Sequence, residues 1–159
     1  MIEEDHVSFE VAKLLKEQGF NEPCRGNYYW DFDDNDNSIV AFGEWTAQAY
    51  DNDFEDEMFI CSAPTLQMTM KWLEEVHHIL VVADYVYECT NTSWVYKIYR
   101  LGKNGKPKRC AVKGVSYYDE HNPSEHIIGY RDYELSHKDY ATREEAETEG
   151  IRYVLEKYV

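Results

Sequence analysis

The stretch from Gly26 to Met70 contains neither Lys nor Arg, although the chain has 16 of these residues in total. The same stretch carries ten carboxylates, which are Asp31, Asp33, Asp34, Asp36, Glu44, Asp51, Asp53, Glu55, Asp56 and Glu57. Acidic groups without neighbouring cations repel one another in a compact chain, so solvent, a metal ion or a basic partner must compensate them. We therefore take these ten residues as the candidate partner-binding site.

Other absences exclude further classes of protein. No run of 18 apolar residues occurs, so no membrane-spanning helix is expected, and the acidic residues 1–5 do not resemble a signal peptide. The four cysteines include no Cys-x-x-Cys pair, which argues against a zinc ribbon and against a dense disulfide framework. We expect a cytoplasmic protein with buried, reduced thiols and no cofactor.

Catalytic signatures are missing as well. No serine or cysteine lies in a nucleophile-elbow pattern, and Gly102 and Gly105 lack the spacing of a phosphate-binding loop. Glu74 can share a helix face with His77 or His78, but the spacing supplies no third metal ligand. The sequence favours a non-enzymatic protein, with a metal-binding domain or a metal-dependent hydrolase as one alternative.

Length and charge narrow the choice of partner. At 159 residues, 43% of them apolar, the chain has the length of one domain and can bury a core. Its net charge of -15 opposes direct contact with nucleic acid or anionic lipid, so a basic protein partner is favoured. One predicted hairpin is an exception, because it gathers six cations: Arg100, Lys103, Lys106, Lys108, Arg109 and Lys113. Such a hairpin is a soluble turn, or it docks on the acidic stretch of the same or another copy.

Three segments have helical periodicity and end signals. The first is predicted over residues 9–18, with Ser8 as its cap and Gly19 as a Schellman stop. The second is predicted to start at residue 62 or 63, with Pro64 in its first turn, and to end near residue 78. The third is predicted to begin at a capping box formed by Thr142 and Glu145 and to close the chain.

Between the second and third helices the period changes to two, which predicts strands over residues 81–88, 94–98, 110–118 and 127–135. A further strand is predicted over residues 39–45, and residues 58–60 also read as a strand. The resulting order predicts a single α+β domain over residues 1–159, with three helices packed on one face of a mostly antiparallel sheet.

Three stretches of the chain carry a family resemblance. They begin at Val7 (VSFEVAKLLKEQGF), at Ser62 (SAPTLQM, leading to KWLEEVH) and at Tyr140 (YATREEA). Together they resemble a group of small uncharacterised proteins of gut anaerobic bacteria, their phages and mobile elements. The resemblance implies a single domain in a mobile-element context, and it brings no activity, cofactor or catalytic residue.

The leading hypothesis is an acidic interaction protein, of phage or mobile-element type, that binds a basic protein partner through the ten carboxylates. In its strongest form the protein mimics DNA, because carboxylates at phosphate-like spacing can occupy the nucleic-acid groove of a host defence protein. Besides the metal-dependent functions, a second alternative is a structural component of a virion or larger complex. Its interface would be the aromatic face of the sheet.

Overall fold

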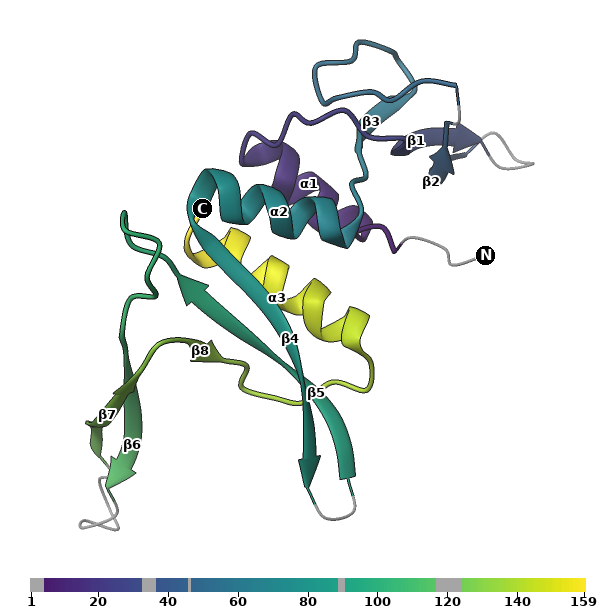
Figure 1. The fold of residues 1–159 in the computed structure, drawn as a ribbon. Coiled ribbons are helices and arrows are strands. Elements are labelled where there is room, and N and C mark those ends of the chain that lie inside the picture. The colour runs from purple at the N-terminus through teal and green to yellow at the C-terminus, as the bar shows by residue number, and fades with distance from the viewer. Residues whose placement is uncertain (1–4, 33–36, 46, 89–90, 117–123) are drawn as a thin grey trace.

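The computed structural model describes residues 5–32, 37–45, 47–88, 91–116 and 124–159 (Figure 1). In chain order its elements are α1 (Phe9–Glu17), β1 (Gly26–Phe32), β2 (Ser38–Glu44), β3 (Phe59–Ser62), α2 (Leu66–His77), β4 (Ile79–Glu88), β5 (Asn91–Arg100), β6 (Cys110–Ser116), β7 (Ser124–Arg131), β8 (Glu134–Leu135) and α3 (Arg143–Lys157). These helices and antiparallel sheets confirm the predicted α+β class.

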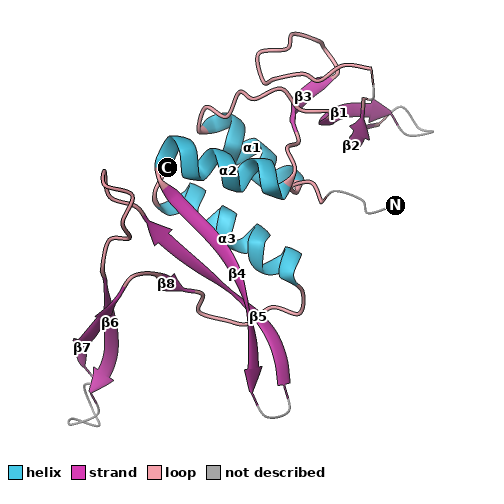
Figure 2. Cartoon of the chain, in the orientation of Figure 1, coloured by secondary structure: helices cyan, strands magenta, loops and turns pink. Residues whose placement is uncertain are grey.

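The strands form three separate sheets. Their orders are β2-β1-β3, β4-β5-β8 and β6-β7, and every pairing between these strands is antiparallel. The helices lie between the first two sheets, with α3 against β4 and β5 and with α1 against β3 (Figures 1 and 2). The sequence predicts one sheet because period-two patterns show which residues form strands but not which strands pair.

Helix α1 ends as the sequence predicts. Gly19 has φ 83°, and the amide of Phe20 donates to the carbonyl of Leu15 while the amide of Gly19 donates to that of Lys16. This is the hydrogen-bond pattern of a Schellman motif, in which glycine accepts the left-handed conformation without strain. The capping box of α3 is also present, since Thr142 and Glu145 each accept from the backbone of the other.

Helix α2 begins later than the sequence predicts, at Leu66 rather than at residue 62 or 63. Residues 62–64 are extended instead: the amide of Ala63 donates to the carbonyl of Gly26, and the carbonyl of Pro64 accepts from Val7. Thr65 is the cap, because its hydroxyl accepts from the amide of Met68. Pro64 therefore precedes the cap instead of lying in the first turn.

Strand β1 is absent from the sequence-based prediction, which assigns no strand before residue 39. Tyr28, Tyr29 and Trp30 are typical strand residues, and their pairing with β2 continues through Phe32. The predicted strand over residues 127–135 is divided into β7 and β8 by a bend at residues 132–133. The last two residues of the predicted strand 110–118 lie outside the described part of the chain.

The core joins the helices to both three-stranded sheets. Leu15, Ile98, Ile151 and Val154 are fully buried within one hydrophobic cluster that draws on α1, β5 and α3. Among the described residues, no helix has both the length and the apolar character needed to cross a membrane.

Gly150 allows α3 to approach the β4–β5 pair closely. A Cβ at this position would lie 2.8 Å from Cγ1 of Val81 and 3.1 Å from Cβ of Tyr96. We expect Gly150→Ala to destabilise the protein, because overpacking costs about 1–3 kcal/mol and exceeds the gain of at most about 1 kcal/mol in helix propensity. In contrast, Gly129→Ala adds a methyl group to open space and should leave the urea unfolding midpoint nearly unchanged. Equal midpoints for the two variants would contradict this packing.

Candidate functional site

The predicted site residues do not share one surface element: two of the described ones lie on the β1–β2 pair and five lie in the segment between β2 and β3. Seven of the ten are described: Asp31, Glu44, Asp51, Asp53, Glu55, Asp56 and Glu57. The other three, Asp33, Asp34 and Asp36, lie outside the described residues. Opposed residues of an antiparallel pair share a face, and successive residues alternate. Asp31 lies opposite Ile39 and Glu44 opposite Gly26, so these two carboxylates project to opposite faces.

Five carboxylates are concentrated within seven residues of the segment between β2 and β3. We call residues 47–58 the acidic loop; its carboxylates are Asp51, Asp53, Glu55, Asp56 and Glu57. Figure 2 shows this segment as a loop at one edge of the molecule. Asp51 is half-buried and the other four are exposed to solvent. The loop thus presents most of the described negative charge of the predicted site.

Asn52 holds the acidic loop in place. Its amide nitrogen donates to the carbonyl of Phe20 at 2.7 Å, and its amide oxygen accepts from the backbone of Ser62 at 2.9 Å. The backbone amide of Asn52 donates to the side chain of Asn21 at 2.8 Å. One residue therefore ties the loop both to the end of α1 and to β3.

Aromatic side chains form a second anchor beneath the loop. Trp45 packs edge-on against Tyr50 with ring centroids 4.9 Å apart, and Tyr50, Phe54 and Phe59 continue the cluster at 4.1 and 5.3 Å. The backbones of Cys24 and Tyr50 exchange two hydrogen bonds of 2.8 Å. Packing of this kind contributes about 0.5–1.5 kcal/mol per aromatic pair beyond simple burial, so it favours one conformation of the loop.

The carboxylates of the acidic loop have no Lys or Arg partner among the described residues. Three of them accept hydrogen bonds from uncharged groups: Asp51 from the amide of Asp53, Asp53 from the side chain of Asn21, and Asp56 from the amide of Met58. Glu55 and Glu57 form neither a hydrogen bond nor an ion pair within the part of the chain that the structure describes. The acidic loop thus displays charge that the described residues do not neutralise with Lys or Arg.

Glu44 has a different environment. Its carboxylate lies 3.5 Å from Nε2 of His6, on the sheet face that also carries Trp30, Phe32 and Phe42. These three aromatic side chains are between 41% and 56% exposed. The neighbours of Glu44 on this face are thus mainly apolar, in contrast to the carboxylates that surround one another in the acidic loop.

The cation-rich segment of residues 100–113, predicted as a hairpin, does not dock on the acidic loop of the same chain. The chain turns tightly between Leu101 and Pro107, with Gly105 at φ 71°, and β6 then pairs with β7 instead of continuing a hairpin with β5. Two ion pairs of residues 100–113 join Arg100 to Glu134 and Arg109 to Asp132. Figure 1 places β6–β7 and β1–β3 at opposite ends of the molecule. Among the described residues, this segment therefore does not neutralise the carboxylates of the acidic loop.

The cysteines of the described residues are buried thiols. Cys24, Cys61 and Cys110 are free, whereas Cys89 lies outside the described part. Burial raises the pKa of Cys24 to about 12 and that of Cys61 to about 11. Both thiols are protonated at neutral pH, which makes them poor nucleophiles.

His77 is half-buried and packs against Trp72 instead of joining a ligand set. Its ring lies 4.6 Å from that of Trp72, and its Nε2 is buried without a hydrogen-bond partner in the described structure. His78 is exposed and adopts the left-handed conformation that ends α2. Within the described residues, no group of three or more His, Cys, Asp or Glu side chains is placed to hold a metal ion.

The environment of His77 predicts a pH dependence of stability. Burial, followed by the charge of His78, lowers the pKa of His77 below its usual value of 6.5. The unfolded state therefore binds more protons below that pH, so stability falls as the pH drops through about 6.5. We expect His77→Gln to reduce this fall in melting temperature, whereas His126→Gln, which changes an exposed histidine, should retain it. An unchanged slope in His77→Gln would contradict the assignment.

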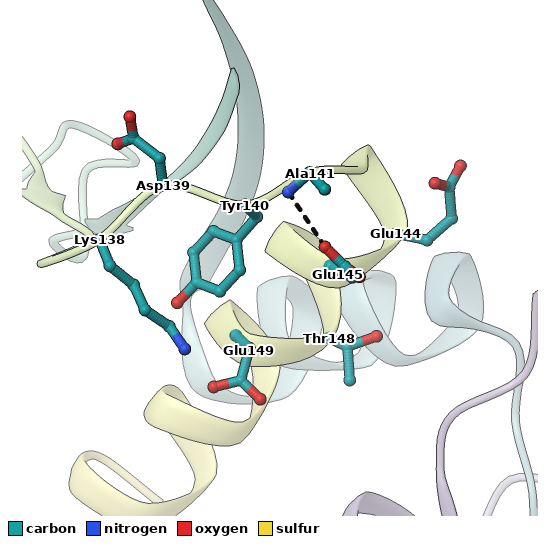
Figure 3. A pocket seen from close by; sticks show the side chains of 8 residues that line it. All are labelled: Lys138, Asp139, Tyr140, Ala141, Glu144, Glu145, Thr148 and Glu149. Carbon is teal, nitrogen blue, oxygen red and sulfur yellow. Dashed lines mark hydrogen bonds between the residues drawn. The ribbon is translucent and has the colours of Figure 1, made fainter. Parts of the chain in front are cut away.

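A hollow of about 530 Å³ lies beside the start of α3 (Figure 3). Its lining includes Glu144, Glu145 and Glu149, but Glu145 is occupied by the backbone amides of Ala141 and Thr142. Neither histidine nor cysteine lines it. One of its carboxylates, Glu145, thus serves to cap the helix.

Comparisons of the chain with protein-family models, with curated proteins and with solved structures find no match.

Proposed function

We propose that this protein is a non-enzymatic interaction protein whose acidic loop binds a basic segment of a partner protein. One observation supports this most strongly: five carboxylates within residues 51–57 are carried on an anchored loop and have no Lys or Arg partner among the described residues. Asp31 and Glu44 belong to the predicted site as well, and they project from opposite faces of the β1–β2 pair.

The physical basis is charge-assisted hydrogen bonding on a preorganised surface. Lys and Arg side chains bind ionised carboxylates through short, strong hydrogen bonds, and Arg can form two at once. Because Asn52 and the aromatic cluster already fix the loop, little conformational entropy is lost on binding. Association should weaken as salt rises, since exposed charges are screened.

In its strongest form this function is DNA mimicry directed at a host defence protein, a form that the resemblance to mobile-element proteins motivates. The partner would then be a nucleic-acid-binding protein, and duplex DNA would compete with this chain for the same groove. Competition by DNA would support mimicry, whereas simultaneous binding of both ligands would contradict mimicry and leave the wider function standing.

Affinity purification from a host lysate at two ionic strengths tests the function. We expect a protein with a basic surface to be retained at about 50 mM salt and released at about 500 mM, where the screening length is a few ångströms. Mass spectrometry identifies the retained protein, and a bait with its loop carboxylates neutralised is the matched control. If both baits recover the same proteins in equal amounts, the acidic loop is not the interface.

A further inference from the structure

A cavity of about 650 Å³ is lined by residues of β5, β6, β7, β8 and α3. Its lining includes five cations, Arg100, Arg109, Lys113, Arg131 and Lys157, but only one carboxylate, Glu134. This excess of positive charge occurs in a chain whose net charge is -15. The cavity is therefore electrostatically unlike the molecule as a whole.

Glu134 can neutralise only one of these five positive charges, and its carboxylate is shared among several donors. It accepts hydrogen bonds from the hydroxyls of Tyr153 and Tyr158 and from the ammonium of Lys157. The Nε of Arg100 lies 3.6 Å from Oε1 of the same carboxylate, slightly beyond hydrogen-bond distance, and it has no other hydrogen-bond partner in the described structure. Glu134 therefore serves two cations and two hydroxyls at once, which leaves Arg100 with hydrogen-bonding capacity for a second acceptor.

Two other lining arginines are also only weakly compensated. Arg131 lies over the ring of Tyr133 at 5.2 Å and has no carboxylate partner among the described residues. Arg109 lies 4.0 Å from Asp132, and both side chains are more than half exposed. Cations held close together repel one another unless an anion lies between them. Guanidinium groups in particular match the geometry of phosphate.

We propose that this cavity binds a small anion that carries a phosphate group. The volume falls within the range of small-molecule sites, about 300–1,000 Å³, and several cations around one carboxylate match a ligand with more than one negative charge. A free anion fits better than a nucleic acid, because a longer polyanion would extend from the cavity over the acidic remainder of the molecule. The site is separate from the acidic loop and does not depend on its function.

Thermal unfolding with sodium pyrophosphate, compared with sodium chloride at equal ionic strength, tests the site. We expect about 10 mM pyrophosphate to raise the melting temperature of the wild-type protein, since a ligand that binds the folded state stabilises it. Titration calorimetry should show the affinity of the Arg109→Gln, Arg131→Gln variant to be reduced about tenfold or more. The Lys103→Gln, Lys106→Gln variant removes the same charge from the turn outside the cavity and should bind nearly as the wild type does.

If pyrophosphate does not raise the melting temperature of the wild-type protein, the proposed site is wrong. This test does not depend on the folding of any variant. Equal losses of affinity in the two double variants would also overturn it, because net charge alone would then explain binding. A short single-stranded oligonucleotide is the third probe. If it binds more tightly than pyrophosphate and depends on Arg109 and Arg131, the assignment to a small anion is wrong.

Discussion

Asn52→Ala is expected to release the acidic loop from the body of the protein and to lower its stability substantially. The substitution removes two side-chain hydrogen bonds and leaves the carbonyl of Phe20 and the amide of Ser62 without their partners. Leaving a buried polar group unsatisfied costs about 1–3 kcal/mol, so the free energy of unfolding should fall by about 2–4 kcal/mol. Chemical denaturation measures this change directly.

Gln48→Ala is the matched control for Asn52→Ala. Gln48 is an exposed amide of the same loop, and replacing such a residue typically changes stability by less than about 0.5 kcal/mol. Asn52→Asp adds a second comparison, because it retains an oxygen acceptor for Ser62 but removes the donor to Phe20. Equal unfolding midpoints for Asn52→Ala and Gln48→Ala would show that Asn52 does not anchor the loop.

Neutralisation of Glu55, Asp56 and Glu57 should have the largest effect on partner binding. The Glu55→Gln, Asp56→Asn, Glu57→Gln variant removes three exposed charges, while Asn at position 56 still offers an oxygen to the amide of Met58. If each exposed pair contributes about 0.5–1 kcal/mol at low salt, the affinity for the captured partner should fall about tenfold or more. Stability should change little, because none of these side chains is buried.

The control variant removes the same charge from the two later helices: Glu74→Gln, Glu144→Gln, Glu156→Gln. All three side chains are exposed, and none lies near the acidic loop in sequence. We expect this variant to retain most of the wild-type affinity. Equal losses in the two variants would show that the partner senses net charge alone, and that the acidic loop has no special role.

Local signals account for the elements that the sequence predicts well. Gly19 terminates α1, and the pair Thr142 and Glu145 starts α3. In both cases the hydrogen-bond partners lie only a few residues apart in the sequence. The start of α2 depends instead on Gly26 and Val7, which pair with the residues just before Thr65 from distant positions. Period and capping signals cannot include such contacts, so the prediction placed Pro64 inside the helix.

The candidate site shows the same division between local and distant information. Composition identifies the cation-free stretch and its carboxylates, and the loop around residues 51–57 is indeed exposed. The sequence does not reveal that Asp31 and Glu44 project to opposite faces. This follows from the register of β1 with β2, and β1 is missing from the sequence-based prediction. Nor does it reveal Asn52 as the anchor, since its partners Phe20 and Ser62 are more than nine residues away.

Hydrogen–deuterium exchange of the free protein, and of its complex with the partner captured at low salt, tests most directly whether the acidic loop is a preformed interface. In the free protein, the amides of Tyr50 and Asn52 should exchange much more slowly than in an unfolded chain, because both are hydrogen-bonded. In the complex, protection should increase across residues 51–58 and stay unchanged in β6 and β7. Exchange of residues 50–58 at the unfolded rate, or new protection confined to β6 and β7, would contradict the account.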